Sequence, residues 1–365
     1  MAIDRRAFLG WAAAAAASPL LAAAPATAPE RFVAARRRDG RHEVAIIDAA
    51  GRDLAAYALP ERGHSFAIDA RRGRLVAFGR QPGYFALAFD RDGAGVRLPL
   101  PEGRHYFGHG AFSADGAVLY ATENDYEAGR AVLGVYDASP GGRWRRIGEF
   151  DCAGIGAHEV VLLPDRRTLC VANGGILTHP DYGKRELNLD SMAPSLAYLD
   201  ARDGRVIESV ALDPALHRLS IRHLALDAAG AVWFGCQYLG AALDRPPLVG
   251  RHRRGEAPRL FAVPDPVLGG LRNYIGSVAA DAAGSVIATS SPIGGRVAYW
   301  DAASGRCLGT NAIADGCGVA GAGAGRFLVS DGHGAITEAG PSRPLRALRE
   351  TTAALEWDNH LRRLG

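Results

Sequence analysis

Five histidines begin short apolar segments that resemble one another along the chain. They are His64, His109, His158, His223 and His360, out of 11 histidines in the sequence. If the segments are copies of one repeat, symmetry places the five imidazoles around a common axis, where they could bind a transition metal ion or haem iron. The alternative is structural, because buried imidazoles at repeat starts also hydrogen-bond the backbone of a neighbouring repeat.

Polar residues flank several of these histidines in the sequence. They are Arg62, Glu159, Arg222 and Asn359. A carboxylate or amide beside a ligand can orient it, and an arginine can bind a small anion. We therefore expect these residues and the histidines to form a ligand site at the mouth of an axial channel.

A segment of roughly twenty residues between two predicted strands is the most distinctive insertion. Long ordered loops in compact domains tend to be functional. Six of its side chains could cover the channel mouth: Asn173, His179, Asp181, Tyr182, Arg185 and Asn188. The same loop could instead pack against a neighbouring repeat or a partner protein.

Other chemical signatures are weak or missing from the sequence. It contains neither Gly-x-Ser-x-Gly nor a P-loop, so a serine hydrolase elbow and a nucleotide cradle have no support. The widely spaced cysteines include no CxxC pair, which excludes a local zinc knuckle or c-type haem attachment. His333 lies in an ordinary Gly-rich turn.

The elements that must position the histidines are short strands. Each copy has an apolar strand, an Asp-x-x-Gly type turn, an aliphatic and aromatic strand, and a strand that ends in Asp. The copies start at His64, His109, His158, His223, Ser277 and Cys317, at roughly 40- to 65-residue intervals, and four-stranded propeller blades repeat at about 40 to 50 residues.

The two ends of the chain complete this pattern. Residues 355–361 resemble a first strand, and three strands between residues 32 and 57 would supply the rest of the same repeat. Pairing of the termini removes open sheet edges. We therefore predict an all-β, seven-bladed β-propeller over residues 30–365, closed by its N- and C-terminal strands. A pair of β-sandwiches is the alternative, but it requires no such completion.

The first 28 residues have the composition of an export signal. Arg5 and Arg6 precede Phe8, an alanine-rich segment and further small residues. This pattern is typical of a twin-arginine (Tat) signal peptide, and its apolar stretch is short for a spanning helix. We expect a periplasmic protein without a stable membrane span after signal removal; an uncleaved N-terminal anchor is the alternative.

Charge and cysteine content set further limits. The formal net charge is only +3, so the composition does not indicate a basic surface for nucleic-acid binding. Five cysteines in an oxidising compartment leave at least one thiol unpaired. Cys307 and Cys317 flank one strand and turn, and they are the most favoured disulfide pair.

One string of motifs resembles a known family. It comprises His158-Glu-Val, Asn173-Gly-Gly-Ile, His179-Pro-Asp-Tyr-Gly, Leu187-Asn-Leu-Asp and Met192-Ala-Pro-Ser-Leu. The string looks like the bacterial domain-of-unknown-function 1513 (DUF1513) family over about residues 30 to 364. That resemblance implies a propeller similar to lactonase-like and quinoprotein-like proteins. It also implies Tat export and periplasmic partners in iron uptake, because members of the family are often encoded beside imelysin-like and di-haem oxidoreductase-like proteins. The family has no assigned reaction.

These observations favour a periplasmic binding or scaffold propeller over an enzyme. Such a protein would act with an iron- or copper-handling system, and it could hold a transition metal ion or haem at the histidine-rich mouth, although the sequence does not identify the ligand. The alternative is a lactonase-like hydrolase or an oxidoreductase that uses the same mouth. Lactonase-type propellers hold a divalent ion through carboxylate and amide oxygens, whereas this rim is rich in imidazole, so the hydrolase is the less favoured of the two.

Overall fold

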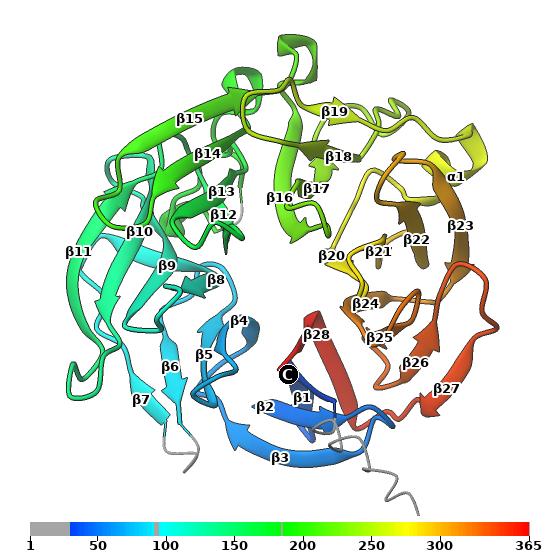
Figure 1. Ribbon diagram of the computed structural model, residues 1–365, viewed down its shortest axis with the longest axis horizontal. Helices are drawn as coiled ribbons and strands as arrows, with labels where there is room; N and C mark the ends of the chain where they lie inside the picture. Colours follow the sequence, from blue (N-terminus) through cyan, green and yellow to red (C-terminus); the bar gives the residue numbers. More distant parts are fainter. Residues whose placement is uncertain (1–29, 91–94, 184, 365) are drawn as a thin grey trace, which may run out of the picture.

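The computed structural model describes residues 30–90, 95–183 and 185–364, so the expected signal peptide at residues 1–28 lies outside the described residues. Within them, seven four-stranded antiparallel sheets are arranged as blades around one axis (Figure 1). The predicted seven-bladed β-propeller is confirmed.

The innermost strand of each blade lines the axis. These strands are β28 (Leu355–Arg363), β4 (Gly63–Asp69), β8 (Arg104–Phe112), β12 (Ala157–Leu162), β16 (Leu219–Leu226), β20 (Ser277–Ala280) and β24 (Gly316–Gly321), for blades 1 to 7. The second strands, in the same order, are β1 (Arg31–Arg38), β5 (Arg74–Gly79), β9 (Val118–Asp125), β13 (Thr168–Asn173), β17 (Val232–Tyr238), β21 (Val286–Ser291) and β25 (Phe327–Asp331).

Two outer strands complete each blade. The third strands are β2 (Arg41–Asp48), β6 (Ala86–Phe89), β10 (Arg130–Asp137), β14 (Ser195–Asp200), β18 (Val249–His252), β22 (Arg296–Asp301) and β26 (Ile336–Ala339). The fourth are β3 (Asp53–Ala58), β7 (Gly95–Arg97), β11 (Arg145–Asp151), β15 (Val206–Ala211), β19 (Arg259–Leu260), β23 (Cys307–Ala312) and β27 (Arg346–Arg349). The α-helix α1 (Asp265–Gly270) precedes β20, and the described chain also contains three 3-10 helices: η1 (Pro180–Tyr182), η2 (Leu189–Ser191) and η3 (Pro214–Leu216).

The termini close the ring as predicted. In blade 1, β28 pairs antiparallel with β1, so that Arg38 lies opposite Leu355 and Phe32 opposite Arg363. Buried Arg36 reinforces the closure, because its guanidinium lies 5.0 Å from the ring centroid of Trp357. The chain therefore needs both of its ends to complete one blade, and no open edge remains there.

The predicted Asp-x-x-Gly turns follow several innermost strands. After β16, the Asp227 carboxylate accepts hydrogen bonds from the backbone N–H groups of Ala229 and Ala231, both at 2.9 Å. Gly230 has a φ of 74°, a left-handed conformation that glycine adopts without steric cost. These local bonds fix the reversal that returns the chain to the second strand of the blade.

Large aromatic side chains fill the space between blades. Trp233 of blade 5 stacks on Phe261 at 4.8 Å between ring centroids, and Phe261 lies 6.4 Å from Trp300 of blade 6. All three are buried. The two indole N–H groups donate to Asp227 at 3.1 Å and to Thr289 at 3.0 Å, so that burial leaves neither donor unpaired.

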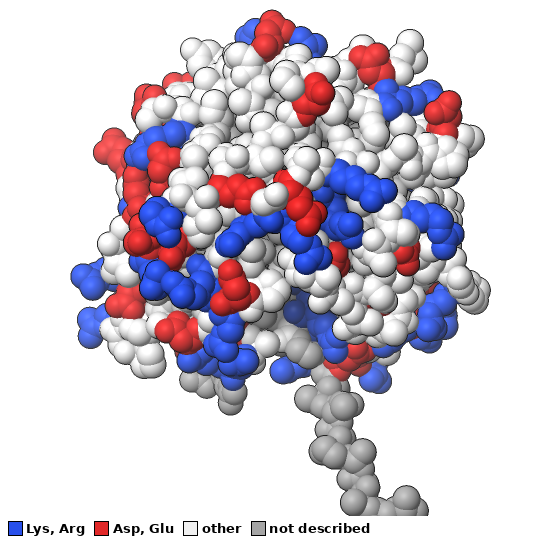
Figure 2. Space-filling model, turned by 45° about the horizontal axis from the view of Figure 1, so that its top comes forward, with Lys and Arg blue, Asp and Glu red and all other residues white. Residues whose placement is uncertain are grey.

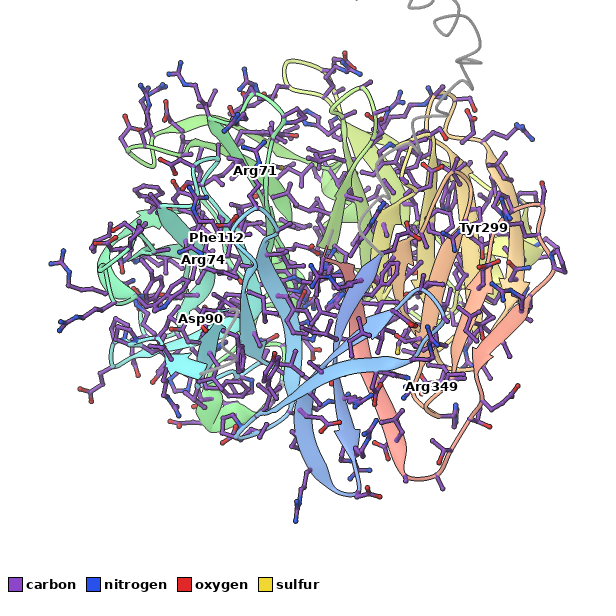
Figure 3. The ribbon with its side chains drawn as sticks, turned by 60° about the horizontal axis from the view of Figure 1, so that its bottom comes forward. Arg71, Arg74, Asp90, Phe112, Tyr299 and Arg349 are labelled. Carbon is purple, nitrogen blue, oxygen red and sulfur yellow. The ribbon has the colours of Figure 1, made fainter. Side chains whose placement is uncertain are left out.

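Arginine also links neighbouring blades. Arg74 of blade 2 lies beside Phe112 of blade 3 (Figure 3), with its guanidinium 5.3 Å from the ring centroid. It also donates to the Asp69 carboxylate at 2.7 Å and to the Gly116 carbonyl at 2.6 Å. A single cation thereby connects two sheets near the ends of their innermost strands.

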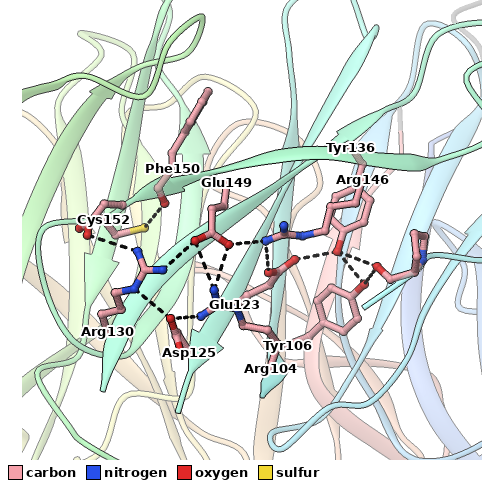
Figure 4. Close-up of polar contacts among 12 residues, drawn as sticks. Arg104, Tyr106, Glu123, Asp125, Arg130, Tyr136, Arg146, Glu149, Phe150 and Cys152 are labelled. Atoms are coloured by element: carbon pink, nitrogen blue, oxygen red, sulfur yellow. Dashed lines mark hydrogen bonds and ion pairs between the residues drawn. The ribbon is translucent and has the colours of Figure 1, made fainter. Parts of the chain in front are cut away.

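Blade 3 contains a buried polar network (Figure 4). Fully buried Glu123 accepts hydrogen bonds from the Tyr136 hydroxyl at 2.7 Å and from Arg146 at 2.9 Å. Arg146 also donates to Glu149 at 2.8 Å, and the hydroxyls of Tyr136 and Tyr106 lie 3.0 Å apart. Burial raises the pKa of Glu123 although Arg146 opposes this shift. The network stabilises the blade away from the axis.

The predicted Cys307 to Cys317 disulfide is not formed. All five cysteines, which lie within the described residues, are free. Cys307 belongs to the outermost strand of blade 6, whereas Cys317 belongs to the innermost strand of blade 7. Between these two residues the chain crosses from the rim of the propeller to its axis. Closeness in the sequence therefore did not bring the two thiols together.

The described surface is mixed in charge. Figure 2 shows basic and acidic side chains next to one another on the face in view, without a continuous basic patch there. Among the described residues, no helix combines the length and apolar character needed to cross a bilayer.

Candidate metal centre in the channel

The structure brings the five predicted histidines together on the propeller axis. They come from the innermost strands β4, β8, β12, β16 and β28, and the ring centroids of contacting pairs lie 4.6 to 6.2 Å apart. The shortest separation joins His64 to His360. The remaining two innermost strands contribute Ser277 and Cys317 at equivalent positions.

A break in strand pairing accompanies each histidine. The register between the innermost and second strands shifts between residues 63 and 66, 106 and 110, 157 and 159, and 221 and 223, and opposite residues 34 and 36 on β1. A β-bulge bends a strand and turns a side chain away from its regular direction. The same device in five blades places the imidazoles at one level of the channel.

Gly108 allows two of the rings to approach. A Cβ atom at this position would lie 2.5 Å from Cδ2 of His64, and the backbone has a φ of +107°. Glycine alone tolerates both conditions. The residue directly before His109 is therefore required for His64 to occupy its place.

Burial keeps the histidines uncharged. All five are at most 6% exposed. Burial is the main cause that lowers the pKa of His64 to about 4 and the pKa values of His109, His158 and His360 well below the usual value. It also lowers the pKa of His223, although Glu159 opposes this shift. Neutral imidazole is the form that ligates metals.

Two buried carboxylates and a hydroxyl contact the Nδ1 atoms. Glu159 lies 3.3 Å from Nδ1 of His223 and 3.7 Å from Nδ1 of His109. Nδ1 of His64 lies 3.7 Å from Asp358, and the Ser277 hydroxyl lies 3.3 Å from Nδ1 of His360. Metal-ligating histidines typically direct their second ring nitrogen toward such groups, which orients the first toward the ion.

Several ring nitrogens lack a hydrogen-bond partner among the described residues. They are Nε2 of His109 and His360, Nδ1 of His158, and Nδ1 of His64, whose 3.7 Å distance to Asp358 is too long for a hydrogen bond. Two sets of three histidines have ligand nitrogens within 4.8 Å of one another: His64, His109 and His158, and His109, His223 and His360. Nitrogens around a tetrahedral zinc ion lie roughly 3.4 Å apart, so a bound ion would draw the rings slightly inward.

Arginines surround the two carboxylates. Arg362 forms an ion pair with Glu159, and both Arg62 and Arg80 contact Asp358, the latter at 3.1 Å. Burial alone would raise the pKa values of Glu159 and Asp358, but these cations and the neighbouring histidines hold both below their usual range. The carboxylates are therefore ionised and already paired.

A cavity of about 180 Å³ adjoins the histidines where the innermost strands begin. His64, His158 and His223 form part of its wall. A second cavity contacts the later residues of the same strands and includes His109 and Glu159 in its lining. The imidazole cluster therefore separates two spaces along the axis.

Comparison with protein families identifies the relatives of this chain. The family described as "Protein of unknown function (DUF1513)" matches residues 57–364. The chain belongs to the DUF1513 family. All five channel histidines lie within the matched residues. A search of curated proteins found no match to the sequence.

Solved structures with the same fold are distant in sequence from this DUF1513 protein. "Kuenenia stuttgartiensis Hydrazine Synthase" has a TM-score of 0.62 at 14% identity, with 87% of this chain and 91% of that chain covered. "Crystal Structure of Mitotic Checkpoint Complex" has a TM-score of 0.55 at 12% identity, with 78% and 75% covered. Both similarities concern the propeller fold, which serves many functions.

The long loop of this DUF1513 chain contributes to the cavity through residues other than those predicted. The lining residues from the loop are Gly174, Ile176, Thr178 and Glu186. None of the six predicted loop residues, all of which the structure describes, lines this cavity. Asp181, Tyr182 and Arg185 are exposed instead.

The remaining three predicted loop residues have structural contacts. Asn173 is buried and donates to the Cys152 carbonyl at 2.9 Å. Asn188 donates to the Gly175 carbonyl at 3.0 Å and holds the base of the loop. His179 accepts the Asp181 N–H at 3.2 Å and begins a short 3-10 helix, Pro180–Tyr182.

Three residues of the site were not predicted from the sequence: Arg80, Asp358 and Arg362. The last two lie within two residues of His360, so the surroundings of that histidine were the available signal. Arg80 follows the second strand of blade 2, and its proximity to the axis depends on the register of the closed ring. The predicted residues Glu159, Arg222 and Asn359 do lie at the cluster or at the cavity beside it.

Proposed function

We propose that this DUF1513 protein binds a transition metal ion at the channel histidines. The observation that carries the proposal is the convergence of five buried, neutral imidazoles, of which His109 and His360 have unpartnered Nε2 atoms. Imidazole suits iron, copper, zinc and nickel, whereas calcium and magnesium prefer oxygen ligands. The two nearby carboxylates are paired with arginines, which leaves the histidines as the ligands.

The space favours an ion over haem. The ring centroids of the contacting histidines lie within 6.2 Å of one another. A porphyrin would require the rings to separate, whereas a single ion requires only that they close around it.

The cellular part of the proposal depends on the sequence. Arg5 and Arg6 with the following alanine-rich segment support Tat export to the periplasm and a protein without a stable membrane span. The family resemblance supports periplasmic partners in an iron-uptake system. We propose that the propeller holds or passes a metal ion within that system and has no reaction of its own.

A second candidate is an enzyme that uses the same ion. Three histidine ligands leave a coordination position open, as in catalytic zinc sites. Here His64, His158 and His223 line a cavity in which a small substrate could reach such a position. This observation favours an oxidoreductase or a metal-assisted hydrolase of small molecules over a lactonase-type enzyme, which needs oxygen ligands.

Metal analysis tests the main proposal. We expect the full-length protein, matured in its native periplasm, to contain a single iron, copper or zinc ion per chain. After chelation it should take up one of these ions again. Clean protein that contains no metal and takes up none of the three would overturn the proposal.

The variant His109→Ala gives the sharpest test, since this histidine belongs to both sets of three. It should lose the ion while its circular dichroism stays that of a folded β-protein. His333→Ala is the matched control because His333 is exposed. Equal metal content in the two variants would exclude the channel as the site.

A further inference from the structure

We infer that the cavity beside the histidines binds a small oxyanion, a carboxylate or a phosphate, through Arg222 and Arg80. The inference adds a ligand to the proposed metal centre, and it rests on that proposed function only for the coupling between the two.

Arg222 is the main observation. It lines the cavity, and its Nε atom is buried with no hydrogen-bond partner among the described residues. Arg362 and Arg80 each form an ion pair with a buried carboxylate, whereas Arg222 forms none within the described chain. An unpaired guanidinium beside an enclosed space is costly unless an anion enters that space.

Arg222 is the one arginine of this site without an ion pair among the described residues. Four arginines surround the histidines: Arg62, Arg80, Arg222 and Arg362. Glu159 and Asp358 pair with the other three arginines, and Glu186 is exposed at the cavity rim. Burial lowers the pKa of Arg222, and Glu186 opposes this shift. A bound metal ion would add further positive charge, so an anionic ligand would then bind more tightly.

The lining suits a ligand with oxygen acceptors and few heavy atoms. Side-chain amides of Gln81, Gln237 and Asn359 supplement the two arginines as donors. Phe107 and Ile176 supply an apolar wall. The volume of about 180 Å³ is smaller than the roughly 300 to 1,000 Å³ of sites for drug-sized ligands. Malonate and inorganic phosphate both fit these limits.

Calorimetry on the metal-free, full-length protein tests the inference with malonate and inorganic phosphate as separate probes. We expect at least one of them to bind, and the preferred probe identifies the chemical class. Arg222→Met should weaken binding at least tenfold, and Arg222→Lys should weaken it less. Methionine keeps an unbranched side chain and removes a charge that has no ion pair among the described residues, so we expect this variant to fold. Arg218→Met is the control, because Arg218 pairs with Asp190 outside the cavity lining.

Glu186→Gln keeps the inference testable if the Arg222 variants do not fold. This exposed substitution removes the rim carboxylate, and it should tighten oxyanion binding several-fold. The inference is overturned if neither malonate nor phosphate binds to the wild-type protein. It is also overturned if wild type and Arg222→Met bind the preferred probe with equal affinity. A protein that binds oxyanion but no metal refutes only the proposed function. One that binds metal but neither probe, with or without zinc, refutes only this inference.

Discussion

Glu159 of β12 accepts a hydrogen bond from Nδ1 of His223 of β16 at 3.3 Å. The same carboxylate lies 3.7 Å from Nδ1 of His109 and forms an ion pair with Arg362. One anion therefore holds the Nδ1 proton of His223 and lies beside that of His109. With the protons at Nδ1, the lone pairs lie at Nε2, where a metal ion would bind.

The first prediction concerns this carboxylate. Glu159→Gln should weaken metal binding by about 10- to 100-fold, as expected for loss of a group that orients ligands. Competition with a chromophoric chelator measures the change. Glu338→Gln is the control, since Glu338 of β26 pairs with Arg346 of β27 in the outer strands of blade 7. Unchanged affinity in Glu159→Gln would show that the carboxylate does not orient the ligands.

The second prediction concerns the approach of His64 to the strand of His109. Gly108→Ala introduces a Cβ atom 2.5 Å from Cδ2 of His64 at a φ of +107°. It should lower the free energy of unfolding by about 1 to 3 kcal/mol and also reduce metal retention. Gly148→Ala in the same blade is the control, because nothing lies within 4 Å of the added atom. Similar unfolding midpoints in urea for the two variants would contradict the role assigned to Gly108.

The fold and the histidine cluster were predictable because both follow from the repeat. Four copies place a histidine a few residues before the aspartate of the turn, as His223 precedes Asp227. A closed ring then turns equivalent sequence positions into neighbours. Blade 1 could be predicted because Trp357 and Phe32 belong to two partial repeats, one at each end of the chain, that together make a complete blade.

The contacts across the axis were not predictable from the repeat. Arg362 and Glu159 belong to blades 1 and 4, and their pairing depends on side-chain length and on the bulges at the axis. The loop prediction had a related weakness, since Asn173 was expected among the side chains that could cover the channel mouth. It instead completes β13 and hydrogen-bonds a backbone carbonyl of the preceding blade. Polarity alone does not distinguish these two situations.

The third prediction concerns the network in blade 3. Glu123→Ala removes an acceptor from both Tyr136 and Arg146 in a buried setting. Loss of one partner of a buried pair costs about 3 to 5 kcal/mol, and we expect about 3 kcal/mol because Arg146 keeps Glu149. Glu356→Ala should cost less than about 1 kcal/mol, since its pair with Arg37 is exposed. Equal losses in chemical denaturation would show that the network contributes no more than a surface pair.

The fourth prediction concerns pH and His105, which lies outside the metal cluster. Nδ1 of His105 lies 3.0 Å from the Tyr106 carbonyl and Nε2 lies 3.1 Å from the Asn124 amide nitrogen. The neutral ring satisfies both contacts by donating from Nδ1 and accepting at Nε2. Protonation would turn Nε2 into a second donor that faces the amide donor. Burial is the main cause that lowers the pKa of His105 to about 4.

The sign of the effect follows from the unfolded state, in which histidine has a pKa of about 6.5. As the pH falls from about 6.5 to about 4, the unfolded chain takes up a proton that the folded protein resists, so stability falls in this window. The difference between the two pKa values corresponds to a loss of about 3 kcal/mol in the free energy of unfolding once His105 is fully protonated. Urea denaturation of metal-free wild type and His105→Gln across this range measures the difference. The variant should lose less stability with acid, and parallel curves would contradict the assignment to His105.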